Sequence, residues 1–276
     1  MRMQGTLARS GGRGFSLVEL AVVMTIVAFL LGGLIYTMSA QIEQRNFEET
    51  RRRLDLAREL ILAFAITNGR LPCPARSAAT AVPVTVAGDE VRNAAFDCIG
   101  DAVTDYYGGT NAGVTLGLLP ARSIGYQQVD PNGFAVDAWG NRLRYAVANL
   151  ITNCSGTSTL PHFVHSVNLR ANGISCQPND LLICRSATGI TATTCGGAAN
   201  QIMSQSLVVA IIYSTGKNGA LAAGGIDEAA NLNGDRVFVF HPPTPAGAAN
   251  GEFDDQFTWI TVGELYGKMI AAGILP

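Results

Sequence analysis

Three groups of residues in this chain have the types and spacing that could do chemistry. One is a lone carboxylate, Glu19, inside an apolar run that extends from Phe15 to Met38 without any other charge. The second is a set of six cysteines that all follow this run. The third is a set of Ser, Asn and Asp residues in loops of the C-terminal half. The first two predict a charge pairing in an apolar setting and disulfide cross-links. The third has oxygen-bearing side chains of the kind that are also common in ordinary loops and turns.

The apolar run is long enough to cross a bilayer as a helix, which takes about 20 residues. A carboxylate at the centre of such a helix costs about 2.5–3.5 kcal/mol on insertion scales, so Glu19 needs a compensating partner. A secretory signal cleaved near Ser39 and Ala40 is one alternative, and an ordinary single-span anchor is another. Neither explains why a carboxylate interrupts the run.

The residues around Glu19 resemble the class III leader of type IV pilins and type II secretion pseudopilins: Gly14-Phe15-Ser16-Leu17-Val18-Glu19-Leu20. The resemblance implies that a prepilin peptidase cuts between Gly14 and Phe15 and methylates the new N-terminus at Phe15. It also implies that Glu19 pairs with the N-terminal amine of a neighbouring subunit in a filament, which would neutralise its charge in an apolar place.

The remainder of the chain is similar, in three stretches and in the same order, to the major pseudopilin of type II secretion. The stretches are 137–145, beginning Asp-Ala-Trp-Gly-Asn, then 213–219 and 253–259. In that family the last two build a calcium site, so the resemblance implies Ser214, Asn218, Asp254 and Asp255 as ligands, with Asp227, Glu228 or Asp235 adding to them. Asn218 stands where the family has Asp, and the intervening loop is longer. The alternative is a set of ordinary loop and turn residues.

The charges and the leader predict where each part of the protein lies. Removing residues 1–14 takes away Arg2, Arg9 and Arg13, and the net charge changes from −2 to −5. The leader should stay on the cytoplasmic side of the bacterial inner membrane, and the C-terminal part should be periplasmic. The expected partners are the prepilin peptidase, other pilin or pseudopilin subunits and the membrane. The sequence has no basic face of the kind that nucleic-acid binding requires, so we expect no nucleic-acid partner.

An even number of cysteines in an exported domain predicts disulfides. Six cysteines allow 15 pairings. We predict bridges between neighbours in the sequence: Cys73–Cys98, Cys154–Cys176 and Cys184–Cys195. A thiolate zinc site is disfavoured because the chain has no C-x-x-C pair.

Hydrophobic periodicity predicts one continuous helix from Phe15 to about Thr67. Residues 1–14 form the cleaved leader, 15–38 a transmembrane or filament-core helix, 39–68 its amphipathic continuation and 69–276 the periplasmic head. Within the head, the Gly, Ala, Pro and Asp content of residues 71–138 predicts loops with short elements. Strands are predicted at 142–150, 162–169, 180–185, 207–214, 236–241 and 257–262, before a short helix at 264–272. The fold class is α+β, with the long helix packed on a mostly antiparallel sheet.

No G-x-S-x-G, H-E-x-x-H or spaced carboxylate pair indicates catalysis, so we expect no enzyme activity. His162 and His165 are predicted to be structural, and Trp139 and Trp259 to be core aromatics. The predicted function is that of a structural subunit, assembled into a type II secretion pseudopilus or a type IV pilus. The alternative is a minor tip pilin whose disulfide-linked head binds a surface, DNA or a secreted substrate.

Overall fold

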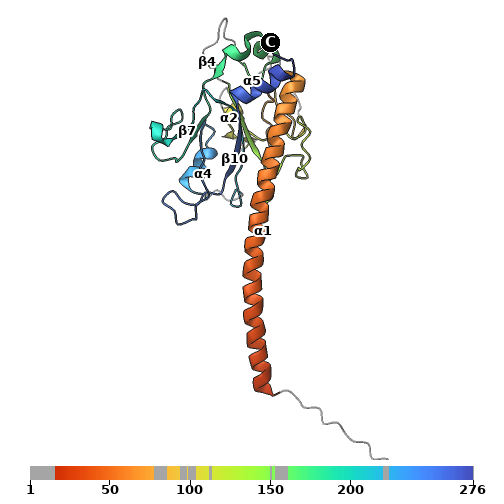
Figure 1. Ribbon diagram of the computed structural model, residues 1–276, viewed down its shortest axis with the longest axis vertical. Helices are drawn as coiled ribbons and strands as arrows, with labels where there is room; N and C mark the ends of the chain where they lie inside the picture. Colours follow the sequence, from red (N-terminus) through yellow and green to blue (C-terminus); the bar gives the residue numbers. More distant parts are fainter. Residues whose placement is uncertain are drawn as a thin grey trace, which may run out of the picture. The chain divides into compact units, whose positions relative to one another are not determined.

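Figure 1 shows a computed structural model of the chain. It describes residues 16–77, 86–93, 98, 104–111, 114–149, 151–152, 161–219 and 224–275. Contacts divide the chain into one unit that ends at Arg45 and a second that begins at Asn46, and each is described by itself. The α+β class predicted from the sequence is confirmed.

The long helix α1 spans Leu17–Asn68. It ends at Gly69, whose φ of 69° is a left-handed conformation that glycine adopts without strain. The predicted long helix is therefore confirmed at its C-terminal end and along its described length. Among the helices that the structure describes, none combines the length and apolarity needed to cross a bilayer. Insertion of residues 15–38 into a membrane stays a prediction.

In the first unit the large apolar side chains of α1 between residues 17 and 31 are exposed. Leu17 is 86% exposed and Phe29 is 80% exposed, and most of the large apolar residues between them are also open to solvent. Ser16 precedes the helix, and its hydroxyl accepts a hydrogen bond from the backbone N–H of Glu19 at 3.2 Å. This is half of a capping box, with Ser at the N-cap and Glu three positions later.

In the second unit the continuation of α1 buries one stripe. Leu54, Ala57, Ile61 and Ala65 recur at helical spacing and are almost fully buried in the head. On either side of this stripe, arginines bond to the head. The guanidinium of Arg53 donates to the carbonyls of Val136 and Asp137, and that of Arg58 donates to the carbonyl of Trp259.

The described residues of the head form four small sheets. The central one has the order β10-β8-β3, from Gln256–Thr261, Val208–Ser214 and Arg144–Val147, with both neighbours antiparallel to β8. A second has the order β7-β6-β9, from Gln201–Met203, Leu182–Cys184 and Val237–Val239, in which β6 and β9 are parallel. Two antiparallel pairs complete the set: β1 (Gly109–Asn111) with β2 (Val114–Leu116), and β4 (Ile151–Thr152) with β5 (Gln177–Pro178).

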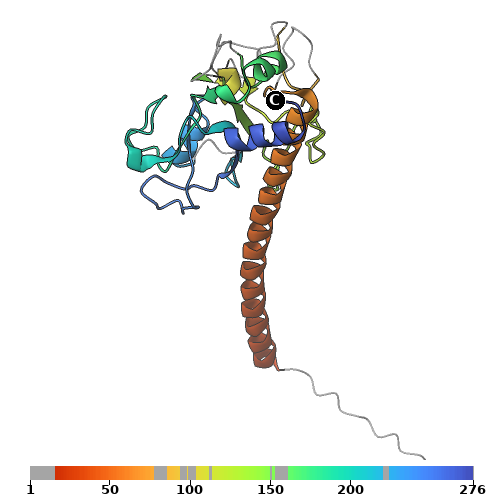
Figure 2. The same cartoon turned by 45° about the horizontal axis from the view of Figure 1, so that its top comes forward.

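Short helices connect and cover these sheets. They are α2 (Thr104–Tyr107), α3 (Ser166–Asn172), α4 (Ile226–Asn231) and α5 (Val262–Ala271), with 3-10 turns at Gly173–Ser175 and Ala198–Asn200. Figures 1 and 2 both place α5 beside the C-terminal end of α1, where Glu264 pairs with Arg58 at 2.5 Å. The hydroxyl of Thr261 caps α5 by accepting from the N–H of Glu264.

The sequence prediction of a strand at 162–169 is wrong. His165 has an extended backbone, and its Nδ1 atom accepts from the N–H of Asn168 at 3.2 Å, which caps helix α3. A local side-chain cap therefore prevails over the β-branched and aromatic composition of this stretch. The other predicted strands and the final helix occur where expected. The strands at 142–150, 180–185, 207–214 and 236–241 are shorter than predicted, whereas β10 and α5 begin one and two residues earlier than predicted. The described part of 71–138 contains only short elements, as predicted.

Two of the predicted disulfides are confirmed, Cys73–Cys98 and Cys184–Cys195. Cys154, of the third predicted pair, lies outside the described residues, whereas its predicted partner Cys176 is buried. The first bridge joins the segment after α1 to residue 98, and the second closes an exposed loop between β6 and β7. A cross-link stabilises mainly by restricting the unfolded chain, and the effect grows with the length of the closed loop. The first bridge, with a sequence separation of 25, should therefore contribute more than the second, with a separation of 11.

One buried titratable side chain in the core makes a prediction about pH. His162 is fully buried, and burial lowers its pKa to about 4. The hydroxyl of Tyr266 already donates to the carbonyl of Cys176, so His162 donates to Tyr266 from Nε2 and stays neutral. Its Nδ1 atom has no partner among the described residues.

The unfolded state binds more protons than the folded state between the two pKa values of His162, about 4 and 6.5. The free energy of unfolding should therefore fall by about 3 kcal/mol as the pH drops through this range. His162→Gln keeps a donor for Tyr266 but cannot titrate, so its unfolding free energy should fall less over the same range. Urea unfolding of both proteins at pH 7 and pH 4 measures the difference. Equal losses in the two proteins would contradict a neutral buried histidine.

Candidate functional site

Three carboxylates that come from separate segments meet at the end of the central sheet. Glu228 lies on α4, while Asp254 and Asp255 directly precede β10. All three are buried, and one oxygen from each lies within 4.8 Å of the others. The loop that follows β8, residues 215–219, closes over the same place. The topology therefore brings acids from distant parts of the sequence into one buried cluster.

Hydrogen bonds orient most of the carboxylate oxygens. Glu228 accepts from the N–H of Asp254 at 2.7 Å and from the side-chain amide of Asn218 at 2.9 Å. Asp254 accepts from the N–H of Lys217 through Oδ2, and Asp255 accepts from the amide of Asn231. Asp254 Oδ1 is buried and has no hydrogen-bond partner among the described residues. An acceptor left unpaired in this way is costly unless a cation or proton occupies the site.

The electrostatics of the cluster disfavour three negative charges. Burial, followed by the nearby charge of Glu228, raises the pKa of Asp254 to about 6. Burial also raises the pKa of Asp255 well above its ordinary value, with Glu228 and Asp254 adding to the effect. Like charges held together without solvent favour protonation, and a bound divalent cation would reverse that preference.

Glycines shape the cradle around these oxygens. A Cβ atom at Gly216 would overlap the carboxylate of Asp254, and one at Gly224 would overlap the carboxylate of Glu228. Gly216 also has a φ of 63°. A cavity of about 230 Å³ adjoins the cluster and is lined by Glu228, Asp255 and the 215–219 loop. The donor set is hard oxygen, buried and partly unpaired, and it fits a hard divalent cation such as Ca²⁺.

Only some of the calcium ligands predicted from the sequence lie in the cluster. Asp254 and Asp255 lie in the cluster, and Glu228 joins them as the sequence reasoning allowed. Asn218 lies beside it but directs its amide nitrogen to Glu228. The hydroxyl of Ser214 donates to Asp137 at 2.6 Å, so this side chain holds the loop instead of facing the carboxylates.

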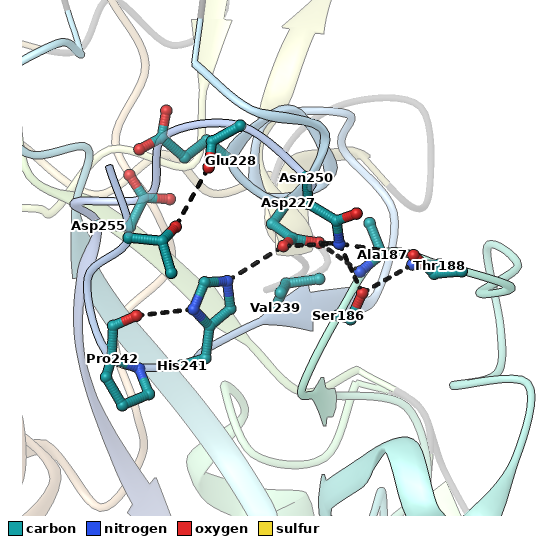
Figure 3. A network of polar contacts seen from close by, with 12 residues as sticks. Ser186, Ala187, Thr188, Asp227, Glu228, Val239, His241, Pro242, Asn250 and Asp255 are labelled. Carbon is teal, nitrogen blue, oxygen red and sulfur yellow. Dashed lines mark hydrogen bonds and ion pairs between the residues drawn. The ribbon is translucent and has the colours of Figure 1, made fainter. Parts of the chain in front are cut away.

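The two other acids named from the sequence belong to different contacts. Asp235 caps its own turn by accepting from Val237 and Asn233. Asp227 is buried in a second polar network, shown in Figure 3. It accepts from the N–H of Ala187 and the amide of Asn250, and the ring of His241 lies between it and the carbonyl of Pro242. This network ties the disulfide loop after β6 to the segment that follows β9.

The stretch 137–141 is a structural hub of the head. The carboxylate of Asp137 is buried and accepts from the N–H groups of Trp139 and Asn141 and from Ser214. Burial raises the pKa of Asp137, while these hydrogen bonds oppose that effect. The amide of Asn141 donates to the carbonyl of Gly216 at 2.6 Å, in the loop that covers the carboxylate cluster.

The N-terminal site consists of the exposed apolar surface of α1 and the single acid Glu19. Glu19 lies in the first turn of the helix, where the helix dipole favours a negative charge. Gly14 and Phe15, the predicted cleavage residues, lie outside the described residues. The sequence alone did not reveal the capping role of Ser16, although its spacing from Glu19 is the usual signal for one.

Comparison with known proteins identifies this segment. Residues 9–35 match the family described as the prokaryotic N-terminal methylation motif. This is the class III leader of type IV pilins and pseudopilins, so the resemblance seen around Gly14, Phe15 and Glu19 is confirmed. Residues 9–35 thus carry the N-terminal motif of type IV pilin-like precursors. No curated protein and no solved structure matches the chain.

The carboxylate cluster predicts that replacing Asp254 stabilises the protein without calcium and destabilises it, relative to the wild type, with calcium. Because the folded-state pKa of Asp254 is raised to about 6, its ionised form destabilises the cation-free protein once the pH exceeds that value. In Asp254→Asn the amide oxygen can still accept from the N–H of Lys217, and the amide nitrogen can donate to the neighbouring carboxylates. At pH 7 in EDTA this variant should be more stable than the wild type by about 1–3 kcal/mol.

Calcium should reverse that order. Binding to the folded state alone raises the melting temperature of the wild type, whereas the Asp254→Asn variant loses a charged ligand and should respond weakly. Thermal melts at pH 7, once in EDTA and once in about 1 mM calcium as a large excess over the protein, measure both effects. Glu59→Gln, which removes an exposed acid on α1, serves as the control and should respond like the wild type. Equal responses of wild type and Asp254→Asn would remove the cluster as the ligand set.

Proposed function

We propose that this protein is a structural filament subunit, cut between Gly14 and Phe15, methylated at Phe15 and assembled into a type II secretion pseudopilus or a type IV pilus. The methylation motif over residues 9–35 carries the proposal. The exposed apolar surface of α1 supports it, because contiguous apolar surface on this scale calls for an apolar partner or environment. Residues 15–38 would lie in the bacterial inner membrane before assembly, with the head in the periplasm.

Glu19 supports the same proposal. It is the single charge among the exposed apolar side chains of residues 17–31. Sister helices could bury those side chains in a filament, and the N-terminal amine freed by cleavage would offer Glu19 an opposite charge. A buried pair of this kind contributes to register more than to stability. Glu19 would thus set the axial position of one subunit against the next.

The processing step can be tested on the mature protein. Mass spectrometry of the N-terminal peptide, from cells that carry a prepilin peptidase, should find a chain beginning with methylated Phe15. Gly14→Val should block the cut and leave residues 1–14 attached. A wild-type chain that keeps Met1, or one that begins at Gln41, would contradict the proposal and favour an anchor or a secretory signal.

The role of Glu19 can be separated from its role in starting the helix. Glu19→Gln removes the charge but keeps the backbone N–H that Ser16 caps and a residue type that suits this position of a capping box, whereas Ser16→Ala removes the cap and keeps the charge. We expect Glu19→Gln to lower recovery in sheared filaments at least tenfold, and Ser16→Ala to assemble like the wild type. The measurement is immunodetection in filaments against the membrane fraction. Loss of assembly in Ser16→Ala alone would show that helix initiation matters and the charge does not.

A further inference from the structure

The head contains a cleft of about 510 Å³ that adjoins the carboxylate cluster, because Asp255 lines both. One wall is the stretch of α1 around Phe47 and Leu54, and the opposite wall is the segment 240–243 after β9. The start of β10, residues 256–258, lies between these walls. Cavities of a few hundred Å³ with mostly apolar linings are the ordinary size of binding sites.

Three phenylalanine rings line the cleft, and each is held by a second aromatic ring. Phe47 meets Trp139 edge-on with the ring centroids 5.0 Å apart. Phe240 meets Trp259 at 5.6 Å, and Phe257 stacks on Tyr213 at 4.9 Å. Because each ring is buttressed from behind, the apolar lining is preformed. A ligand that enters it would not have to order these side chains.

The middle of the cleft is a free strand edge. β10 is the outermost strand of its sheet, and β8 occupies only one of its sides. The carbonyl of Trp259 accepts from Arg58 on α1 and so points away from β8. Backbone groups alternate in direction along a strand, so the N–H and C=O of Phe257 point away from β8, as those of Trp259 do. Phe257 itself lines the cleft. Among the described residues, no backbone group outside the sheet bonds to them.

We propose that this cleft binds an extended segment of another polypeptide, which adds a strand to β10 at Phe257 and places an apolar side chain among the three rings. An unpaired strand edge is a template for a further strand, and main-chain pairing with side-chain pockets is an established mode of peptide recognition. The exposed side chains of Arg51 and Asp55 on the helix wall provide charges of both signs. They suit a segment in which polar residues alternate with the apolar ones.

A small apolar molecule would satisfy the rings but would leave the N–H and C=O of Phe257 unpaired. This site goes beyond the proposed function, because it requires neither processing at Gly14 nor assembly through Glu19. It assigns to the head the recognition of a polypeptide, while the N-terminal helix carries assembly.

The probe is an acetylated, amidated peptide of alternating threonine and valine with a lysine at each end, titrated into the full-length protein in detergent. Because Trp139 and Trp259 back two of the lining rings, binding should change tryptophan emission. Two N-methylated forms of the probe separate strand pairing from apolar contact, one methylated on the odd amides and one on the even amides. One form should lose binding at least tenfold and the other should bind like the parent.

A pair of variants gives the matching test on the protein. Phe257→Ala removes the ring and keeps the N–H, whereas Phe257→Pro also removes the N–H that points away from β8, a change that edge strands tolerate. The proline variant should bind the probe at least tenfold more weakly than the alanine variant. Both must melt cooperatively, and if the proline variant does not, the methylated probes alone decide.

Equal binding of both methylated probes, or loss of both, would overturn the proposal, because pairing at one edge makes only one set of amides essential. Absence of any emission change with the parent probe would overturn it as well. Dimers of the protein that disappear in Phe240→Ala would show that a second copy occupies the cleft in place of a peptide.

Discussion

The head is organised around one buried carboxylate, that of Asp137. It accepts three hydrogen bonds, from two backbone N–H groups in its own turn and from the hydroxyl of Ser214 at the end of β8. The backbone carbonyl of the same residue accepts from Arg53 on α1. One residue thus joins the long helix, a tight turn and the central strand. An unpaired charge at that position would be strongly destabilising, so these elements must fold together.

The two candidate sites of the head depend on this arrangement. The turn that Asp137 holds also places Asn141 against Gly216, in the loop that covers the carboxylate cluster. Asp255 directly precedes β10, which pairs with β8. Phe257 follows two residues later and lines the cleft. Cation binding would relieve charge repulsion at the start of β10 and would thereby stabilise the head. The proposed peptide site uses the neighbouring edge of the same strand.

Local patterns in the sequence predicted the elements whose stabilisation is also local. The leader motif, the periodicity of α1 and the near-sequence cysteine pairs Cys73–Cys98 and Cys184–Cys195 each depend on residues close together in the chain. The mispredicted segment at 162–169 shows the limit, because one histidine cap outweighed strand propensity there. The cluster of Glu228 with Asp254 and Asp255 needed the fold of the intervening loop to be known. Nothing in the sequence indicated the cleft at Phe257, because the residue pattern of an edge strand does not differ from that of a central strand.

The central claim is that sister helices cover the exposed apolar surface of α1 in a filament. Phe29, which is 80% exposed in the described structure, can be replaced by a photoreactive phenylalanine analogue and irradiated in assembled filaments. The account predicts cross-links to the N-terminal helices of other filament subunits, lost when cleavage at Gly14 is blocked. Cross-links confined to lipid, in chains processed normally, would contradict it.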